Sequence, residues 1–278
     1  MLKPVYVEAT TIPDAWSQAI WNCIRHGRTF TIDRGSYEGS KRHEFDYFTV
    51  HIQKPWITPF EPELPERLQH TDIPPPVAKG YINGYLPYLM TGNKEPNEEY
   101  TYGQRLNSFP ITDEGIYQYA LRKNVESKSE FVRCDKEIWN NKEIVSSKLT
   151  ETTMEFFLNQ VEFMIWNYKK YGHRDNQMVL QIAHPNDMLW QNPPCLRHID
   201  TRIQDNALHF MPYFRSWDLW GGFPANLAAI ELLKQYCALK IGVENGEIVA
   251  SSKGLHIYKH TFELGEAISN CTIEEFIA

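Results

Sequence analysis

One cysteine of the sequence stands where its chemistry can differ from that of an ordinary buried thiol. Cys195 directly follows Pro194, and Arg215 comes 20 residues later. If the two apolar segments after Cys195 are adjacent strands, Arg215 returns beside the cysteine, where its charge stabilises the nucleophilic thiolate. We therefore predict that Cys195 is a catalytic nucleophile. We interpret the other four cysteines as inert: Cys23, Cys134, Cys237 and Cys271.

The common catalytic signatures do not occur in the sequence. It contains no phosphate-binding G-x-x-x-x-G-K-S/T, no G-x-G-x-x-G, no H-E-x-x-H and no G-x-S-x-G. His256 and His260 are four residues apart, but Ile257 and Tyr258 between them favour a strand, on which the two rings do not converge on one ion. We therefore predict no metal site.

Several short motifs follow one another in a fixed order and together point to one family. They are Tyr100-Thr101-Tyr102-Gly103, Pro194-Cys195, Arg215-Ser216-Trp217-Asp218 with Gly222, Pro224 and Asn226 beyond it, and His256-Ile257-Tyr258. As a set they resemble the thymidylate synthase family, especially its short archaeal-type members. The resemblance covers roughly residues 80 to 265.

The resemblance implies a reaction and its reagents. The Cys195 thiolate adds to C6 of dUMP, and C5, otherwise a poor nucleophile, becomes an enolate-like carbon that captures a one-carbon unit. The expected donor is 5,10-methylenetetrahydrofolate or a related reduced pterin, which also supplies the hydride that gives dTMP. We accordingly expect a homodimeric methyltransferase whose partners are a nucleotide and a folate.

Five residues are expected on the nucleotide side of such a site. By the resemblance, Arg215 and Ser216 hold the phosphate, for which a guanidinium is suited by its paired hydrogen bonds. The amide of Asn226 can both donate and accept against the O4 and N3 edge of uracil, whereas a carboxylate there would suit cytosine. His256 and Tyr258 are expected to bind the sugar hydroxyl. The alternatives are a surface ion pair for Arg215 and a helix-cap or turn role for Asn226.

Four further residues are expected to complete the site. By the same resemblance, Asp218 meets the pterin and Gly222 belongs to the folate side. Tyr102 is expected near the nucleophile and the proton-transfer path, and Arg34 matches the family's mobile phosphate arginine. As alternatives, Asp218 caps the helix that follows it, and Tyr102 is a core residue.

The sequence also departs from the family pattern. Tyr85 stands where the family has its catalytic glutamate, with Glu98 and Glu99 as other candidates, and Asn176 and Gln177 stand where a partner subunit supplies two phosphate arginines. Compared with the family pattern, the tryptophan-rich insertion is absent, and the closing C-terminal segment is expected to be short or missing. Because reduction to a methyl group requires that water be excluded, 5-hydroxymethylation of dUMP, dCMP or CMP stays an alternative. The other alternative is that the protein is a homologue that binds a nucleotide but does not catalyse a reaction.

Composition narrows the class of protein and its compartment. The 278 residues carry a formal net charge of −7, which argues against a nucleic acid polymer as partner because such a binder needs a basic surface. The five cysteines are scattered without a C-x-x-C pair, which indicates a reducing compartment. No secretory signal and no membrane-spanning segment is predicted. We expect a cytoplasmic enzyme that does not bind membranes.

The elements that must position these residues follow from apolar periodicity and turn chemistry. Helices are predicted at 13–26, within 80–92, at 152–170 and at 224–241, and strands at 177–184, 196–203, 207–215 and 247–251. Asp14 is expected to cap the first helix, and Gly27 to end it in a left-handed conformation.

The remaining segments connect these elements. Gln204-Asp205-Asn206 is expected to form a turn, and Asn245-Gly246 a hairpin-type turn. The prolines of 53–80 predict a long irregular connection. The fold class is α+β, with a mixed, mainly antiparallel sheet packed by a long buried helix and a loop-rich N-terminal third. We expect a single domain over 1–278, with a divergent region 1–80 and a catalytic core 81–265.

Overall fold

A computed structural model describes residues 1–278 except 34–36, 70–73, 97, 123–143, 150–153 and 277–278. The chain forms two compact units, which are described separately. The first unit consists of Met1–Pro87 and Asn176–Ala278, and the second of Tyr88–Asp175. The single domain over the whole length stays a prediction.

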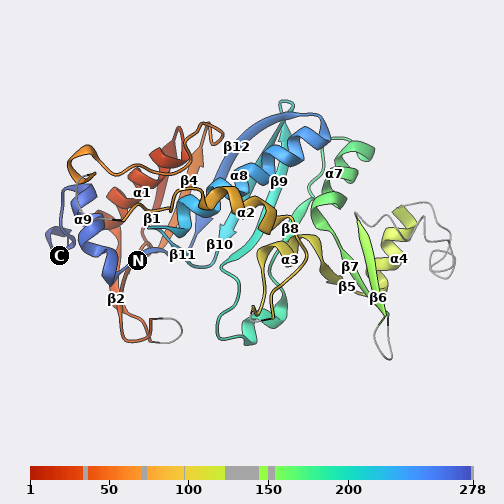
Figure 1. The fold of residues 1–278 in the computed structure, drawn as a ribbon, viewed down its shortest axis with the longest axis horizontal. Helices are drawn as coiled ribbons and strands as arrows, with labels where there is room; N and C mark the ends of the chain where they lie inside the picture. The colour runs from red at the N-terminus through yellow and green to blue at the C-terminus, as the bar shows by residue number, and fades with distance from the viewer. Residues whose placement is uncertain (34–36, 70–73, 97, 123–143, 150–153, 277–278) are drawn as a thin grey trace. The chain divides into compact units, whose positions relative to one another are not determined.

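A six-stranded sheet forms the centre of the first unit (Figure 1). In order across the sheet, its strands are β1 (Pro4–Ala9), β4 (Tyr47–Ile52), β12 (Glu244–Ser252), β10 (Ala207–Phe214), β9 (Leu196–Gln204) and β8 (Val179–Gln181). The β1–β4 and β10–β12 pairs are parallel, and the other three are antiparallel. The expected mixed, mainly antiparallel sheet is therefore present.

Two helices pack on one face of this sheet. Helix α8 (Gly222–Ile241) contacts β10 and β12, and helix α1 (Ile12–His26) contacts β1, β4 and α8. Helix α8 buries residues nearly all round, because the sheet and α1 both cover it. The prediction of a long buried helix packed on the sheet is confirmed.

The ends of α1 differ from what the sequence suggested. The cap is Thr11, whose hydroxyl accepts a hydrogen bond from the Asp14 backbone N–H at 3.2 Å, so the prediction of Asp14 as the cap is wrong. Gly27 is not left-handed, since its φ is −70°. A Cβ there would lie 2.6 Å from the His43 ring, so close approach explains this glycine better than a special dihedral angle.

The two turns predicted at Gln204-Asp205-Asn206 and Asn245-Gly246 have different outcomes. Asp205 and Asn206 have φ of 52° and 59°, and they join β9 to β10 as predicted. Asn245 and Gly246, however, lie inside β12, so the prediction of a hairpin turn there is wrong. Because α8 crosses back over the sheet, β12 runs parallel to β10 and needs no tight turn.

A second sheet in the same unit has the order β11-β13-β3-β2. Its strands are β2 (Arg28–Thr31), β3 (Lys41–Glu44), β11 (Trp217–Asp218) and β13 (Leu255–Tyr258). The N-terminal third thus supplies strands to both sheets besides its long connection, which holds only the short helix η1 (Glu66–Leu68) among its described residues.

Short helices complete the first unit. Helix α2 (Tyr81–Leu89) continues through Pro87, and its residues up to Pro87 belong to this unit. The others are η2 (Pro185–Leu189), η3 (Lys259–Thr261), α9 (Phe262–Ser269) and η4 (Ile273–Phe276).

The second unit is built on the three-stranded sheet β5-β7-β6. Its elements are α3 (Tyr102–Asn107), β5 (Phe109–Ile111), α4 (Asp113–Arg122), β6 (Val145–Leu149), β7 (Met154–Leu158) and α7 (Gln160–Tyr171). The helix predicted over 152–170 is therefore wrong over residues 154–158, and 152 and 153 lie outside the described residues. Met154–Leu158 pairs with both neighbouring strands, and the Asn159 side chain accepts from the Glu162 N–H at 3.1 Å, which starts the helix only at Gln160.

Candidate active site

Cys195 lies immediately before β9, next to the end of the paired strand β10. The Arg215 backbone N–H donates to the Cys195 carbonyl oxygen at 2.8 Å, just past the β9–β10 pair Leu196–Phe214. The spacing of 20 residues therefore does bring Arg215 beside Cys195 on the adjacent strand, as the sequence predicts.

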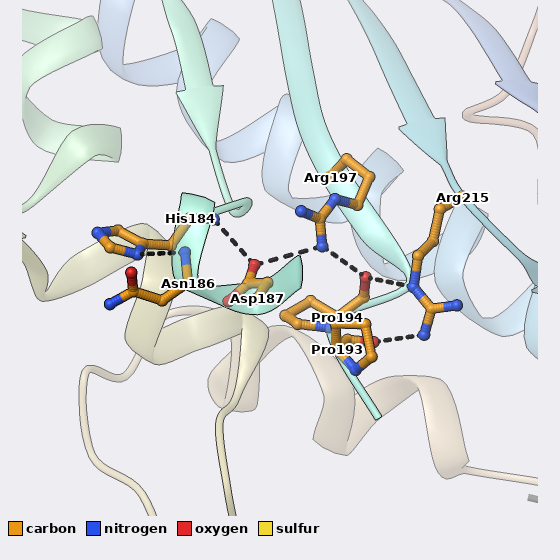
Figure 2. Close-up of polar contacts among 7 residues, drawn as sticks. All are labelled: His184, Asn186, Asp187, Pro193, Pro194, Arg197 and Arg215. Carbon is orange, nitrogen blue, oxygen red and sulfur yellow. Dashed lines mark hydrogen bonds and ion pairs between the residues drawn. The ribbon is translucent and has the colours of Figure 1, made fainter. Parts of the chain in front are cut away.

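Two guanidinium groups donate hydrogen bonds to the backbone of the two prolines that precede Cys195 in the sequence (Figure 2). Arg215 donates from Nε to the Pro194 carbonyl at 3.2 Å and from Nη2 to the Pro193 carbonyl at 2.6 Å. Arg197 donates from Nη1 to the same Pro194 carbonyl at 3.1 Å. These bonds hold the carbonyl groups of the two prolines that directly precede Cys195.

Arg197 is itself held by a buried acid. Its Nη1 lies 3.3 Å from Oδ2 of Asp187, which is fully buried. Asp187 also accepts from the His184 N–H at 2.8 Å, at the start of η2 (Figure 2). The sequence analysis missed Arg197, although its place two residues after Cys195 puts it on the same side of a strand as the cysteine.

The charges around Cys195 act in opposite directions on its thiol. Burial raises the pKa of Cys195, and the positive charges of Arg215, Arg197 and Arg42 lower it without cancelling the effect of burial. Arg42 was also missed by the sequence analysis, because β3 itself was not predicted. It pairs with Tyr258 on β13, and its Nη2 lies 2.7 Å from Glu44.

His256 on β13 is buried, and its ring can accept a hydrogen bond at Nε2. Its Nδ1 lies 2.8 Å from the Gly254 carbonyl, so Nδ1 carries the proton and donates. Burial lowers the pKa of His256 to about 4, which keeps the ring neutral near pH 7. Nε2 then presents a lone pair, and among the described residues it has no hydrogen-bond partner.

Tyr258 lies next to His256, with the two rings 4.6 Å apart in an edge-to-face arrangement. Burial raises the pKa of Tyr258, and the negative charge of Asp218 and the Cys195 thiolate raise it further. This electrostatic coupling indicates that Cys195, Asp218, His256 and Tyr258 belong to one polar cluster of the first unit.

Asp218 has the structural role that the sequence left open as an alternative. Its Oδ2 accepts from the N–H groups of Gly221 at 3.0 Å and Gly222 at 2.8 Å, at the beginning of α8. A Cβ on Gly222 would lie 3.3 Å from the Asp218 Cβ, so the glycine allows a close approach. The expected folate contacts of both residues stay predictions.

Asn226, in the first turns of α8, has both ends of its amide engaged. Oδ1 accepts from Trp217 Nε1 at 3.0 Å, and Nδ2 donates to Tyr85 Oη at 2.6 Å. Tyr85, at the position where the resemblance places a glutamate, therefore contacts the residue expected to read the base. Asn226 makes these contacts from within the helix rather than as its N-cap, which is Gly221.

The roles expected of three other residues stay predictions. Ser216 is half-buried between β10 and β11. Tyr102 lies in the second unit, in the first turn of α3 after its cap Thr101, and its catalytic role stays a prediction. Arg34 lies outside the described residues.

The α+β fold of the first unit thus holds Cys195 beside two arginines, directly before a strand. The thymidylate synthase family model matches residues 99–272. Three archaeal relatives, from Methanosarcina mazei, Methanosarcina barkeri and Methanococcoides burtonii, carry the name "Putative thymidylate synthase".

These relatives are similar to the chain over nearly all of its length. They are 28%, 26% and 26% identical over 268, 263 and 267 residues, and each alignment covers 94% of this chain and 93% of the relative. The family model spans more than half of the chain, and this chain therefore belongs to the thymidylate synthase family.

Two other features are absent from the described part of the chain. No helix there is long and apolar enough to cross a membrane. The same residues contain no group of three or more His, Cys, Asp or Glu that could hold a metal ion.

Proposed function

We propose that this enzyme transfers a one-carbon unit from a reduced folate or related pterin to C5 of dUMP, giving dTMP. The observation that carries the proposal is the placement of Cys195. Arg215 and Arg197 hold the backbone that directly precedes this thiol. The charges of Arg215, Arg197 and Arg42 favour its thiolate, while burial opposes it. A nucleophile that needs the charge of its surroundings suits a reaction that begins by thiolate addition.

In the proposed reaction, Cys195 Sγ forms a bond to C6 of the uracil ring. The electron pair of the C5–C6 double bond then moves toward C5 and O4, so an enolate develops and C5 becomes nucleophilic. The amide of Asn226 faces that edge of the base and stabilises the developing charge through its N–H. C5 then forms a bond to the one-carbon unit and loses its proton. The hydride that the bound folate would supply reduces that carbon to the methyl group, while the C5–C6 double bond returns and the Cys195 thiolate leaves C6.

The anionic and sugar parts of the substrate are held by other groups of the same unit. Two of the five N–H donors of the Arg215 guanidinium bind the prolines, and the others are directed to the phosphate together with the Ser216 hydroxyl. His256 Nε2 accepts a hydrogen bond from the sugar hydroxyl, which supplies the donor that this buried nitrogen needs.

Asp218 and Gly222, at the beginning of α8, fit one edge of the pterin of a folate. A pterin ring presents N–H donors, and the Asp218 carboxylate is held in place by the backbone of Gly221 and Gly222 while keeping further lone pairs. When bound, the folate supplies the one-carbon unit and the hydride. Asp218 would orient it, with Gly222 leaving room for its approach.

The test follows the C5 hydrogen of the nucleotide. The enzyme is incubated with dUMP tritiated at C5 and methylenetetrahydrofolate, and both tritium release and the mass of the product are measured. In the Cys195→Ala variant, the rate of tritium release is expected to fall more than about a thousandfold. Cys271→Ala, which removes another half-buried thiol, is the matched control and keeps the activity.

The product distinguishes the possible functions. A methylated nucleotide supports thymidylate synthesis, and a hydroxymethylated one identifies a pyrimidine nucleotide 5-hydroxymethylase. Tight nucleotide binding without C5 exchange identifies a non-catalytic homologue. Full exchange in Cys195→Ala would contradict both enzymatic functions.

We also propose a homodimer that works in the cytoplasm. The face of the six-stranded sheet away from α1 and α8 carries half-exposed side chains, and Val249 and Tyr47 on it are 36% and 37% exposed. A second copy of the chain would cover this face. A reducing compartment keeps the Cys195 thiol available for reaction.

A further inference from the structure

The side-chain amide of Asn226 has two possible orientations, in which Oδ1 and Nδ2 exchange places, and its hydrogen-bond partners determine which one is stable. The indole Nε1 of Trp217 is a donor only, so the atom 3.0 Å from it must be the amide oxygen. Tyr85 Oη, 2.6 Å from Nδ2, can both accept and donate, so it tolerates either orientation. Of these two hydrogen-bond partners, Trp217 is the one whose chemistry requires a single orientation.

The packing around Trp217 keeps its indole N–H directed at the Asn226 amide. Trp217 is 2% exposed, and its ring stacks on Phe214 with centroids 3.9 Å apart and planes 6° apart. Phe223 lies against it at 4.6 Å. The indole can neither turn away nor reach water, so reversing the Asn226 amide would oppose two donors and leave a buried N–H without a partner.

A fixed amide reads one type of base edge. Uracil presents an acceptor at O4 next to a donor at N3, whereas cytosine presents a donor at N4 next to an acceptor at N3. For one placement of the ring over Cys195, the two bases need opposite orientations of the amide.

On the proposed function, we infer that Trp217 is a specificity-determining positioning residue: its indole N–H fixes the Asn226 amide so that the site accepts 4-oxopyrimidine nucleotides and rejects 4-aminopyrimidine nucleotides. Trp217 acts through Asn226 and does not itself touch the substrate. Tyr85 tethers the amide but does not choose its orientation.

The experiment compares two variants that each remove one hydrogen bond to Asn226. Dissociation constants for dUMP and dCMP are measured by calorimetry, without folate, for the wild type, Trp217→Phe and Tyr85→Phe. In Trp217→Phe, the amide can reverse freely, so the preference for dUMP over dCMP falls about tenfold, mainly because dCMP binds better. In Tyr85→Phe, both nucleotides bind more weakly and their ratio stays within about twofold of the wild type.

Two additions keep the test decisive. Tyr81→Phe, on the same helix and 5.7 Å from the Tyr85 ring, controls for loss of a tyrosine hydroxyl. If Trp217→Phe does not fold, replacement of Trp217 by 3-benzothienylalanine removes the N–H while it keeps the ring volume, and the same fall in the ratio is expected.

Several results would overturn the inference. These are an unchanged ratio when the indole N–H is removed, an equal fall in Tyr85→Phe, and a wild type without preference for dUMP. In each of these cases, Cys195-dependent release of tritium from dUMP can still be observed, so the proposed function would stand. Absence of any nucleotide binding to the wild type would overturn both.

Discussion

At the scale of single residues, the site is governed by the balance between burial and charge. The Cys195 thiol is buried enough for its pKa to rise, yet three arginines lower the cost of the thiolate. A buried thiol without such charges shows the other extreme, because burial raises the pKa of Cys23 far above its ordinary value. Reactivity at Cys195 therefore depends on its surroundings and not on exposure alone.

This balance predicts how fast Cys195 reacts with an alkylating reagent. Because its pKa is raised, the rate with iodoacetamide should still be rising at pH 9.0, the ordinary pKa of the thiol. Arg197→Gln removes a positive charge and keeps donors for Pro194 and Asp187, so it should raise the pKa further and slow the reaction at pH 8 about three- to tenfold.

The control lies on the same strand. Arg202→Gln removes an exposed arginine of β9 and should leave the rate unchanged. Peptide mapping assigns the modified cysteine. Equal rates in the wild type and Arg197→Gln would show that the Arg197 charge does not act on Cys195.

His256 predicts a dependence of stability on pH. Its pKa is about 4 in the folded protein and 6.5 when unperturbed, so between these values the unfolded state binds more protons. Stability from this group is thus present above pH 6.5 and is lost as the pH falls toward 4, by about 2 kcal/mol at pH 5.

Denaturant unfolding at pH 7 and pH 5 measures this loss. His256→Asn keeps a donor for the Gly254 carbonyl but does not titrate, so its stability should fall less on acidification than that of the wild type. The other titrating groups are common to both proteins. The same pH dependence in both would refute the assignment to His256.

At the scale of elements, close approach explains glycines that sequence patterns leave ambiguous. Gly103 in α3 lies so near the end of α2 that a Cβ would clash with the carbonyl oxygens of Tyr88 and Thr91. This contact is part of the second unit, and no side chain fits into it.

Gly103→Ala should therefore destabilise the protein by about 1–3 kcal/mol, because α3 must move away from Tyr88 and Thr91. Gly115→Ala in α4 is the matched control. There, a Cβ would make an ordinary contact at 3.5 Å with the Ile111 Cβ, and the helix would gain up to about 1 kcal/mol. Urea unfolding of both variants tests the contrast, and equal stabilities would contradict the steric reason.

At the scale of the whole molecule, the net charge of −7 and the binding of an anion are compatible. The net charge is a sum over all 278 residues, whereas Arg42, Arg197 and Arg215 all act on the one thiol at Cys195. A mononucleotide responds to the local charge, and a long polymer would meet the acidic surface.

The homodimer proposal predicts the effect of a charge on the uncovered sheet face. In β12, Ile248 and Ala250 are buried under α8, so Val249 points to the opposite face. Val249→Lys should raise the dimer dissociation constant about tenfold or more, because it would bury an unpaired ammonium group. Sedimentation velocity over a range of concentrations measures the constant.

Leu239→Lys is the control for this surface. Leu239 is 78% exposed on α8, in the helix layer, and a lysine there should not change the association. A wild type that sediments as a monomer, or equal effects of the two substitutions, would contradict the proposed interface.

Local patterns in the sequence predicted much of the core of the fold. The apolar periodicity of α1 and α8, the strands β9 and β10, and the turn at Asp205 and Asn206 depend on neighbours within a few residues. Helix α8 was recognisable because residues buried on all sides leave a continuous apolar run. The position of Arg215 beside Cys195 followed from the length of two adjacent strands.

The tertiary structure decided what depends on segments far apart in the chain. Met154–Leu158 is a strand because two other strands pair with it, and Asn245-Gly246 is no turn because α8 returns β12 parallel to β10. Arg42 reaches the site only because β3 pairs with β13, across more than 200 residues of sequence.

By itself, the sequence determined the reactive groups of this protein: a cysteine after a proline, an arginine one hairpin away, and an asparagine and a histidine in the order of one family. Only the tertiary structure decided how they are set, with Arg197 holding the Pro194 carbonyl, Nδ1 of His256 protonated, and the Asn226 amide fixed by Trp217. The physical reason is that residue types supply donors, acceptors and charges, whereas burial and the partners brought together by folding fix their orientation and protonation.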